Sequence, residues 1–388
     1  LRVIEPPLSL YVHLPWCVRK CPYCDFNSHH AGDNAPKDRY ILALLHDMEQ
    51  QAHRGDGREI QTVFLGGGTP SLFTPNEIGR LLDGAKQHFS IAQNAEVTME
   101  ANPGTVECGS PAGYRDAGVT RLSVGAQSFD DATLGLLGRI HSSADISCAV
   151  LDAKDAGFDN INIDLMHDLP NQTVEMAMAD LSAAIDLDPT HISWYQLTLE
   201  PNTVFYARPP ANLPDDDLAF EIQDRGQELL KRHGYEQYEV SAYAREGRRC
   251  QHNLNYWSFG DYLAIGAGAH GKITNASGIF RYQRPANPMQ YMIMQESNEP
   301  EAGLRPLGEA DLMFEFMLNA LRLNEGFAEK LFAARTGLTT SDLVDAAVDV
   351  RKKGLIERDD NQFWIPTRLG RRFLNDLQSG FIIDDVES

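Results

Sequence analysis

The sequence has no apolar run near the roughly 18 residues of a membrane-spanning helix, and its basic residues are in the minority. Lysine and arginine number 34 against 55 aspartates and glutamates, so the formal net charge of the 388-residue chain is −21. Because a phosphate backbone is bound by a basic surface, this balance argues against nucleic acid as a partner. The first residues also lack the apolar core of a signal peptide. We therefore expect no membrane span and no nucleic-acid ligand.

Cysteine is scarce too, because the chain holds only six. None of them is placed for covalent attachment of a c-type haem, since Cys24 is followed by Asp25 rather than by histidine. Three cysteines lie scattered at positions 108, 148 and 250, and we expect them to be free thiols. Free thiols, together with the metal cluster that the other three cysteines indicate (below), are typical of a reducing compartment, so we expect a cytoplasmic protein.

The other three cysteines, Cys17, Cys21 and Cys24, form a C-x3-C-x2-C pattern directly after an apolar segment. Three thiolates on one short loop can hold three of the four irons of a 4Fe–4S cubane, which leaves the fourth iron open to an exchangeable ligand. Zinc is one alternative, but a structural zinc site uses four closed ligands, usually as two pairs. A disulfide framework is another, and three neighbouring cysteines in a long chain fit it poorly. The pattern favours the iron–sulfur cluster.

Short apolar segments alternate with segments of helical periodicity along residues 8–197. This alternation predicts an α/β fold with a parallel sheet and right-handed crossovers, in which the chemistry lies at the carboxyl ends of the strands. The expected strands are Leu8–Leu14, Thr62–Gly66, Glu96–Ala101, Arg121–Gly125, Asn160–Asp164 and His191–Leu197. The expected helices lie at residues 38–53, 75–88, 109–117, 130–137, 143–156 and 174–187.

Beyond residue 201 the pattern changes. A turn-rich link leads to an expected helix near residues 218–233 and a seventh, edge strand at Tyr235–Val240. The run His252-Asn253-Leu254-Asn255-Tyr256-Trp257 (HNLNYW) follows, and then a glycine-rich run at residues 265–271.

From about residue 305 the order helix–helix–strand–turn–strand predicts a small helical domain of winged-helix type. Acidic residues outnumber basic ones in this part as well, so we expect packing or a partner protein rather than DNA as its role. We divide the chain into residues 1–240 with the cysteine loop at 15–26, residues 241–304 with the HNLNYW run, and residues 305–388.

Five further runs share one family pattern with the cysteine loop. They are Tyr11-Val12-His13-Leu14-Pro15-Trp16-Cys17, Gly66-Gly67-Gly68-Thr69-Pro70-Ser71, Glu100-Ala101-Asn102-Pro103-Gly104, Gly125-Ala126-Gln127-Ser128-Phe129 and Leu137-Gly138-Arg139-Ile140-His141. The cysteine loop, with an aromatic residue before its last cysteine, resembles the signature of the radical S-adenosylmethionine (SAM) superfamily. Together the runs resemble the oxygen-independent coproporphyrinogen III oxidase (HemN) family, from about residue 8 to the end of the chain.

This resemblance implies an open (β/α)6 partial TIM barrel of radical SAM type, followed by the small C-terminal helical domain of HemN-like proteins. It also implies a 4Fe–4S cluster held by Cys17, Cys21 and Cys24, with SAM on the open iron. The residues that match family positions around SAM are Tyr11, Tyr23, Gly67, Gly68, Thr69, Glu100, Gln127, Arg139 and Asp164. Each of them, taken alone, is also compatible with a structural role.

The resemblance also implies individual roles. Tyr23 is similar to the aromatic residue beside the adenine, and the glycine run to the segment that meets the amino group of SAM. Glu100 is placed to accept hydrogen bonds from the ribose hydroxyls or the amino group. A guanidinium such as that of Arg139 can pair bidentately with the SAM carboxylate. We expect Glu100, Gln127 and Asp164 to end the third, fourth and fifth strands.

Two features depart from the oxidases of the family. Those enzymes read C-x3-C-x2-C-x-C, whereas Phe26 stands at the fourth cysteine position here. They also handle their substrate with an N-terminal extension, and only 16 residues precede Cys17 here. Both departures argue against decarboxylation of coproporphyrinogen III.

The HNLNYW run resembles a box in the haem-chaperone branch of this family. That resemblance implies haem as a ligand, with His252 bound to the iron and Tyr256 and Trp257 stacked on the porphyrin. Imidazole is a common axial haem ligand. The Cys250 thiolate is an alternative ligand, and a structural role for His252 stays open.

The expected function is therefore a haem chaperone that binds a 4Fe–4S cluster, SAM and haem. It would pass haem to an acceptor protein such as a membrane respiratory enzyme, and no residue is assigned a catalytic role. One alternative is a radical SAM oxidoreductase that acts on coproporphyrinogen III. Another is a radical SAM enzyme for a different substrate class.

Overall fold

The βα units expected from the sequence form one curved, open sheet. The computed structural model describes residues 5–32, 34–104, 109–297 and 303–382. Six parallel strands follow one another in chain order and confirm the expected (β/α)6 arrangement. They are β1 (Leu8–Leu14), β4 (Glu59–Gly67), β5 (Ser90–Ala101), β6 (Arg121–Gln127), β7 (Ile161–His167) and β8 (His191–Gln196).

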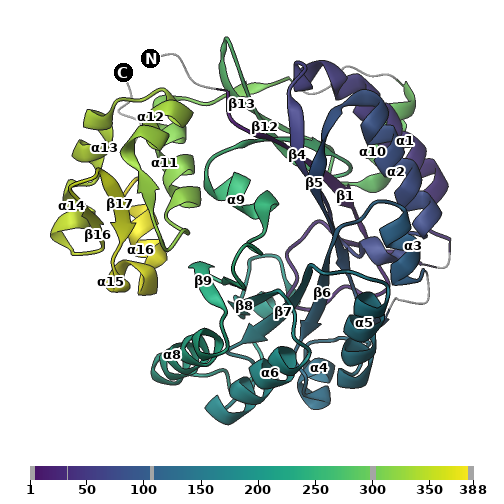
Figure 1. Cartoon of the computed structure of the whole chain (residues 1–388), viewed down its shortest axis with the longest axis horizontal. Helices are drawn as coiled ribbons and strands as arrows, with labels where there is room; N and C mark the ends of the chain where they lie inside the picture. Colours follow the sequence, from purple (N-terminus) through teal and green to yellow (C-terminus); the bar gives the residue numbers. More distant parts are fainter. Residues whose placement is uncertain (1–4, 33, 105–108, 298–302, 383–388) are drawn as a thin grey trace.

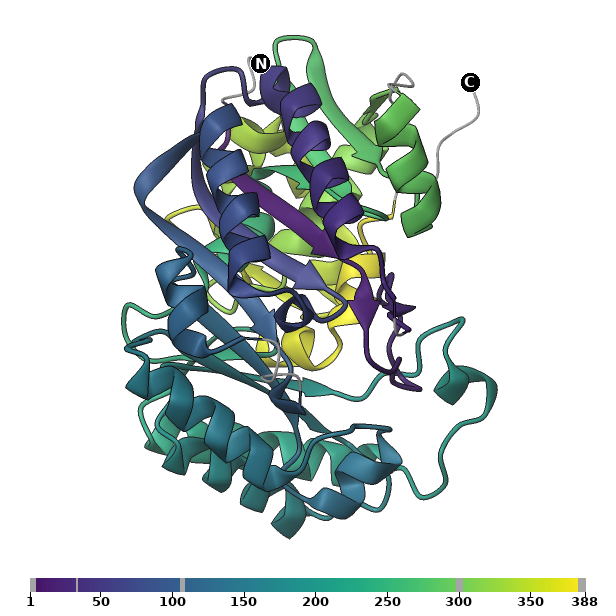
Figure 2. The same cartoon turned by 90° about the vertical axis from the view of Figure 1, so that its right-hand side faces the viewer.

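Helices cover the outer side of this curve, as Figure 1 shows. Their starts follow from local sequence: the Thr74 side chain accepts a hydrogen bond from the Glu77 backbone N–H in a capping box, and Pro75 occupies the first turn of α2. Figure 2 shows α1 and α2 side by side across the strands. The covering helices are α1 (Lys37–Gln51), α2 (Pro75–His88), α3 (Pro111–Asp116), α4 (Asp131–Leu136), α5 (Ser143–Asp155), α6 (Val174–Asp186), α8 (Asp216–Arg232) and α10 (Pro288–Ser297). The short α7 (Val204–Ala207) instead lies beside the cysteine loop.

The alternation along each strand separates an apolar outer face from a polar inner face. On β6, Leu122, Val124 and Ala126 belong to the main hydrophobic core, whereas Arg121 and Ser123 alternate with them. The inner Ser123 hydroxyl donates to Asp164 on β7 at 2.9 Å. Polar groups therefore line the inner side of the sheet.

The sheet continues beyond the six strands at both edges. The expected edge strand is confirmed as β9 (Glu236–Glu239), which pairs with β10 (Ala242–Ala244) at one end. At the other end β11 (Asp261–Ile265) pairs in parallel with β1. Antiparallel strands complete that edge: β12 (His270–Asn275), β13 (Gly278–Gln283) and β14 (Arg305–Pro306).

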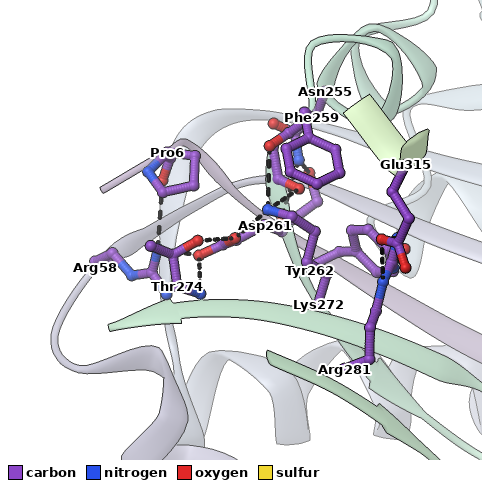
Figure 3. A network of polar contacts seen from close by, with 12 residues as sticks. Pro6, Arg58, Asn255, Phe259, Asp261, Tyr262, Lys272, Thr274, Arg281 and Glu315 are labelled. Carbon is purple, nitrogen blue, oxygen red and sulfur yellow. Dashed lines mark hydrogen bonds and ion pairs between the residues drawn. The ribbon is translucent and has the colours of Figure 1, made fainter. Parts of the chain in front are cut away.

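A buried ion network fastens these added strands, and Figure 3 shows it. Asp261 opens β11 and accepts from Lys272 Nζ at 2.9 Å and from Arg58 Nη1 at 2.8 Å. Thr274 adds bonds from its backbone N–H and its hydroxyl, at 2.8 and 2.9 Å. Asp261 and Lys272 are 0% and 1% exposed, so each charge depends on the other for compensation.

The C-terminal part has its own core and confirms the expected winged-helix-like domain. A three-stranded sheet in the order β15-β17-β16 packs beside short helices. Phe259 and Ile279, from the preceding segment, join the same core. The elements are α11 (Glu309–Ala320), β15 (Phe327–Ala328), α12 (Glu329–Thr336), α13 (Thr340–Ala346), α14 (Val348–Lys352), β16 (Ile356–Arg358), β17 (Phe363–Pro366), α15 (Arg368–Arg372) and α16 (Leu374–Ser379).

Helix α9 (Gln251–Trp257) carries the HNLNYW run and lies on the inner side of the sheet, between the strands and the C-terminal domain (Figure 1). It contacts β1, β4 and α11. No helix in the described ranges combines the length and apolar character that a bilayer crossing requires.

Candidate functional site

The three clustered cysteines lie on one loop at the carboxyl end of β1. β2 (Trp16–Cys17) opens the loop and pairs with β3 (His29–His30) after it. All three cysteines are free thiols and partly exposed. The fold thus places the three sulfurs together where parallel α/β sheets carry their chemistry.

The loop is braced from within. Lys20 Nζ donates to the carbonyl oxygens of Phe26 and Ser28 at 3.1 and 3.4 Å. Phe26 occupies the position of the oxidases' fourth cysteine. Its side chain is 59% exposed and cannot bind a metal. The described loop therefore offers three thiols and no fourth.

Donors from neighbouring elements are directed at these sulfurs. Burial raises the pKa of the Cys17 thiol, while hydrogen bonds from Thr69 and Ser28 lower it. Arg139 Nη1 donates to Cys21 Sγ at 3.5 Å. Such donors favour the thiolate, which is the form that binds iron. Among the described residues, no three metal-ligating side chains are arranged around a single metal ion. A 4Fe–4S cubane does not require this, because each thiolate binds a different iron.

The glycine run at the end of β4 packs against the cysteine loop. The Gly68 backbone N–H donates to the carbonyl of Leu14 at the end of β1, and that of Thr69 donates to the carbonyl of Trp16 in the loop, each at 2.8 Å. Gly67 has φ +113°, and a Cβ there would lie 2.3 Å from His13 Cε1. Only glycine accepts both the dihedral angle and the contact. The run therefore fixes the loop's position. We call the surroundings of this turn, as far as Glu100 and Arg139, the cradle.

Glu100 lies in this cradle at the end of β5. Its Oε2 accepts from the Gly67 backbone N–H at 3.0 Å. Burial raises the Glu100 pKa to about 7, with a further rise from the Asp164 carboxylate and an opposing effect of the Gly67 bond. Tyr11 stands nearby, and its hydroxyl hydrogen-bonds His13 Nδ1 at 2.9 Å. A cationic ligand beside Glu100 would offset the cost of its ionisation.

Arg139 and Gln127 form the far wall. Arg139 Nη2 donates to the Gly125 carbonyl at 2.9 Å, while its buried Nε has no partner in the described structure. Gln127 ends β6 with φ +73° and accepts from the Tyr195 hydroxyl at 2.6 Å. A small pocket lined by Cys21, Thr69 and Arg139, among others, opens here. An unused donor at this place suits an anionic group such as a carboxylate.

Tyr23 lies between two cysteines of the loop and packs toward α7. Its ring centroid is 6.3 Å from that of Phe205, whose backbone N–H donates to the Pro22 carbonyl at 3.0 Å. Burial raises the Tyr23 pKa, so the ring stays neutral and offers an apolar face.

Asp164 differs from the expectation. The sequence places it at the end of a strand, but β7 continues to His167 because Leu165 and Met166 extend the apolar pattern. Asp164 therefore lies in mid-strand, on the inner face. It accepts from Ser123 Oγ at 2.9 Å and from Asn162 Nδ2 at 2.8 Å, and it lies opposite Gly125 of β6.

The HNLNYW run, which the sequence left without a secondary structure, forms α9, and its histidine points into the protein. His252 is 1% exposed, and its Nδ1 lies 2.8 Å from Thr62 Oγ1 on β4. The Glu96 carboxylate accepts from the backbone N–H groups of Gln251 and His252 at 3.0 and 3.2 Å, which caps the helix. Burial lowers the His252 pKa to about 3, and its Nε2 has no partner in the described structure.

The two aromatic residues of the run are also engaged. Tyr256 packs on Tyr262 with 4.3 Å between ring centroids. The Arg322 guanidinium, from the turn after α11, lies 4.4 Å from the Trp257 ring centroid. These contacts join α9 to β11 and to the C-terminal domain, so in this conformation the run connects the sheet to that domain.

The sequence alone missed two residues of the site, His13 and Asn27. The His13 Nε2 hydrogen-bonds the Asn27 carbonyl at 2.8 Å. Asn27 Nδ2 in turn donates to the carbonyls of Ala267 and Ala286, both at 2.9 Å. Tyr11 and His13 are two residues apart on β1, so their side chains are on the same face of the sheet. This spacing could have predicted that His13 lies in the site with Tyr11.

The sequence-expected residues for SAM thus gather around one cradle, with Asp164 in mid-strand beside Gly125. The HNLNYW run lies on the inner face of β1 and β4. Three features of the cradle fit a cluster with bound SAM. They are three partly exposed thiols with donors aimed at them, a glycine turn packed so closely that a Cβ would clash with His13, and a buried unpartnered donor on Arg139.

Comparison with known proteins agrees with this geometry. The radical SAM superfamily model matches residues 11–181, and the HemN C-terminal domain model matches residues 307–373. A haem chaperone HemW of Haemophilus influenzae is 47% identical over 98% of this chain and 99% of its own length. That of Escherichia coli is 46% identical over the same shares, and that of Bacillus subtilis is 31% identical over 96% and 99%.

Among solved structures, the coproporphyrinogen III oxidase HemN from Escherichia coli, a radical SAM enzyme, matches with a TM-score of 0.81. It is 24% identical and covers 97% of this chain and 90% of its own. This likeness establishes a shared fold over both the sheet and the C-terminal domain.

Proposed function

This chain belongs to the HemW family within the radical SAM superfamily, and on that premise we propose that it is a haem chaperone. The near full-length similarity to relatives of that name carries the proposal. The exposed Phe26 in place of a fourth cysteine agrees with it, because it separates this loop from that of the oxidases. We propose three units, at residues 1–240, 241–304 and 305–388. The strands β11 to β14 extend the sheet of the first unit.

We propose that Cys17, Cys21 and Cys24 hold a 4Fe–4S cluster and that SAM occupies the adjoining cradle. One-electron reduction is the chemistry that such a cluster supplies. In this proposal the chain's own residues bind and orient SAM: Arg139 Nε pairs with its carboxylate, and Glu100 accepts from its amino group or ribose. Tyr11, Tyr23, Gly67, Gly68, Thr69, Gln127 and Asp164 complete the proposed SAM surroundings.

The haem ligand is a separate question. His252 was the sequence-based choice, and its Nε2 is unpartnered. However, the His252 side chain is buried between its own helix, α9, and the sheet. A porphyrin reaches this nitrogen only if α9 moves away from Thr62. Ligation by His252, with Tyr256 and Trp257 on the porphyrin, therefore stays a prediction that requires an open state.

We further propose that the chaperone works in the cytoplasm and passes haem to a separate acceptor, such as a membrane respiratory enzyme. The acidic chain, with a net charge of −21, suits a soluble carrier that avoids nucleic acid. Oxidation of coproporphyrinogen III is the alternative, because the fold is that of HemN.

An anaerobic absorption titration of the full chain with haem tests the proposal. Saturable one-to-one binding is expected, and it should persist when Cys17, Cys21 and Cys24 are all replaced by alanine, because the haem site does not need the cluster. Cys148→Ala, at an exposed free thiol, is the matched control. Absence of saturable binding by the wild type would overturn the chaperone function, and conversion of coproporphyrinogen III to protoporphyrinogen IX would establish the alternative.

A further inference from the structure

A buried series of hydrogen bonds, the polar relay, runs from the start of α9 to Asp164 on β7. Cys250, the residue before α9, donates its backbone N–H to the Tyr238 hydroxyl oxygen at 3.3 Å. The Tyr238 hydroxyl lies 2.8 Å from His191 Nε2. His191 Nδ1 in turn lies 2.6 Å from Asn162 Oδ1. Asn162 Nδ2 donates to Asp164 at 2.8 Å, so the relay joins the HNLNYW helix to the proposed SAM surroundings.

The direction of every bond in the relay follows from its partners. Asn162 Nδ2 also donates to Ser123 Oγ at 2.7 Å, so the oxygen of the Asn162 amide is the acceptor that faces His191. His191 Nδ1 therefore carries the proton. Burial lowers the pKa of His191 and keeps the ring neutral, so its Nε2 accepts from the Tyr238 hydroxyl. Every donor thus points toward Asp164, and bonds aligned in this way strengthen one another.

The members of the relay between its two ends are shielded from solvent. Asn162, His191 and Tyr238 are each 1% exposed, and Cys250 is 0% exposed. Solvent therefore cannot replace a bond that is lost here, and an unpaired buried polar group is costly. A rearrangement at one end of the relay consequently favours a rearrangement at the other.

Asp164 forms the end of the relay that faces the cradle. Burial raises the pKa of Glu100 in the cradle, and the charge of Asp164 raises it further. The two oxygens of Asp164 accept from Asn162 Nδ2 and from Ser123 Oγ, at 2.8 and 2.9 Å. A hydroxyl or ammonium group of SAM that donates to Asp164 shares this negative charge, so it weakens the bond from Asn162.

Arg121 on β6 adds a second connection between the same two ends. It is 2% exposed, and its Nε has no partner in the described structure. Burial lowers the Arg121 pKa, whereas Glu96 and Asp164, among other groups, raise it. Glu96 is the carboxylate that accepts from the first backbone N–H groups of α9. A cation beside Asp164 repels Arg121 toward Glu96, where the guanidinium competes with those N–H groups.

We propose that the polar relay couples SAM in the cradle to haem at α9, with His191 and Tyr238 as positioning residues. SAM that donates to Asp164 weakens the relay, so the start of α9 is held less firmly and α9 moves away from Thr62 more readily. Haem then reaches His252 more readily, and SAM raises the affinity for haem. This inference rests on the proposed haem and SAM binding and adds the regulation of one by the other.

Thermodynamic linkage fixes the reciprocal effect. If SAM raises the affinity for haem by a given factor, haem raises the affinity for SAM by the same factor. Such coupling factors are typically about 5–150-fold, and we expect at least about fivefold here.

The test is an anaerobic haem titration of the cluster-loaded full chain, without reductant, in the absence and in the presence of saturating SAM. The ratio of the two dissociation constants is the coupling factor. Calorimetric titration with SAM, with and without bound haem, measures the same factor independently. We expect about fivefold or more for the wild type, and a factor within about twofold of one for Tyr238→Phe, which removes one hydroxyl and keeps the ring.

Tyr235→Phe is the matched control. Tyr235 is also 1% exposed, and its hydroxyl donates to the Pro189 carbonyl at 2.7 Å, outside the relay. This variant should keep the wild-type coupling factor. His191→Phe interrupts the relay at a second point and should lose the coupling as Tyr238→Phe does. A purely structural role of these residues would lower stability and leave the coupling factor unchanged.

The outcomes separate the coupling from the function on which it rests. If the wild type binds both ligands with a coupling factor of one or less, the coupling is wrong while the chaperone function stands. The same conclusion follows if Tyr238→Phe or His191→Phe keeps the wild-type factor, or if Tyr235→Phe loses it. If the wild type binds no haem, the proposed function itself fails, and if it binds haem but no SAM, the proposed SAM site fails.

Discussion

His252 and Thr62 are joined by a hydrogen bond of 2.8 Å that fastens α9 to the inner face of the sheet. The Thr62 hydroxyl donates onward to Ser9 Oγ, also at 2.8 Å, so Nδ1 of His252 carries the proton in this arrangement. Asn255 Nδ2 donates to the same Ser9 oxygen at 2.8 Å. Ser9 on β1 therefore links that strand both to Thr62 on β4 and to Asn255 in the HNLNYW run.

Replacing His252 should reduce stability. His252→Ala removes a buried ring and leaves Thr62 with one partner fewer, so we expect a loss of about 2–4 kcal/mol in the free energy of unfolding. Urea denaturation of the cluster-free protein measures it, with His233→Ala within roughly 0.5 kcal/mol of wild type as control. An unchanged midpoint for His252→Ala would mean that α9 is not anchored here.

Arg139 should matter for SAM far more than for folding. Arg139→Lys keeps the positive charge but loses the planar fork, so we expect SAM affinity to fall roughly tenfold or more. Calorimetric titration of the cluster-loaded protein under anaerobic conditions measures it. Arg208→Lys, at an exposed arginine after α7, is the control and should have no effect. Equal affinities for both variants would remove Arg139 from the site.

Glu100 should give the protein a specific pH dependence. Its pKa rises from 4.5 to about 7 on folding, so the folded chain holds a proton that the unfolded chain has released. Stability contributed by this group is therefore present below pH 4.5 and declines as pH rises toward 7. The stability of wild type relative to Glu100→Gln should fall across this window in urea titrations of the cluster-free protein. A flat difference between pH 4.5 and 7.5 would contradict the raised pKa.

The buried network of Figure 3 predicts an order of effects. Asp261→Asn removes the carboxylate shared by Lys272 and Arg58, so a loss of about 3–5 kcal/mol is expected. Lys272→Met should cost less, because Arg58 still pairs with Asp261. The double variant should lose less than the sum of the two, since both act on one contact. Urea unfolding of the three variants checks this, and the reverse order would contradict it.

Much of the fold could be predicted from the sequence because its signals are local. The six strands and their helices follow from alternation and capping, and α2 begins at Thr74–Pro75 as these residues indicate. The cysteine loop and the glycine run are contiguous motifs. The structure brings them together because the ends of β1 and β4 are neighbours in a parallel sheet.

The rest depends on contacts between distant residues. β11 is five residues long and precedes a glycine-rich run, so only its pairing with β1 identifies it as a strand. The burial of His252 follows from the packing of α9 on β4, which no spacing within HNLNYW encodes.

The pairing of β1 with β11 also bears on how the chain reaches this state. Leu8 lies opposite Asp261, about 250 residues later, so one edge of the first strand stays unpaired until the ribosome has made most of the protein. Open edges of apolar strands invite association with other chains, and contacts this distant slow folding. During synthesis, β1, which leads into the cysteine loop, therefore stays without its second neighbouring strand until β11 has been made.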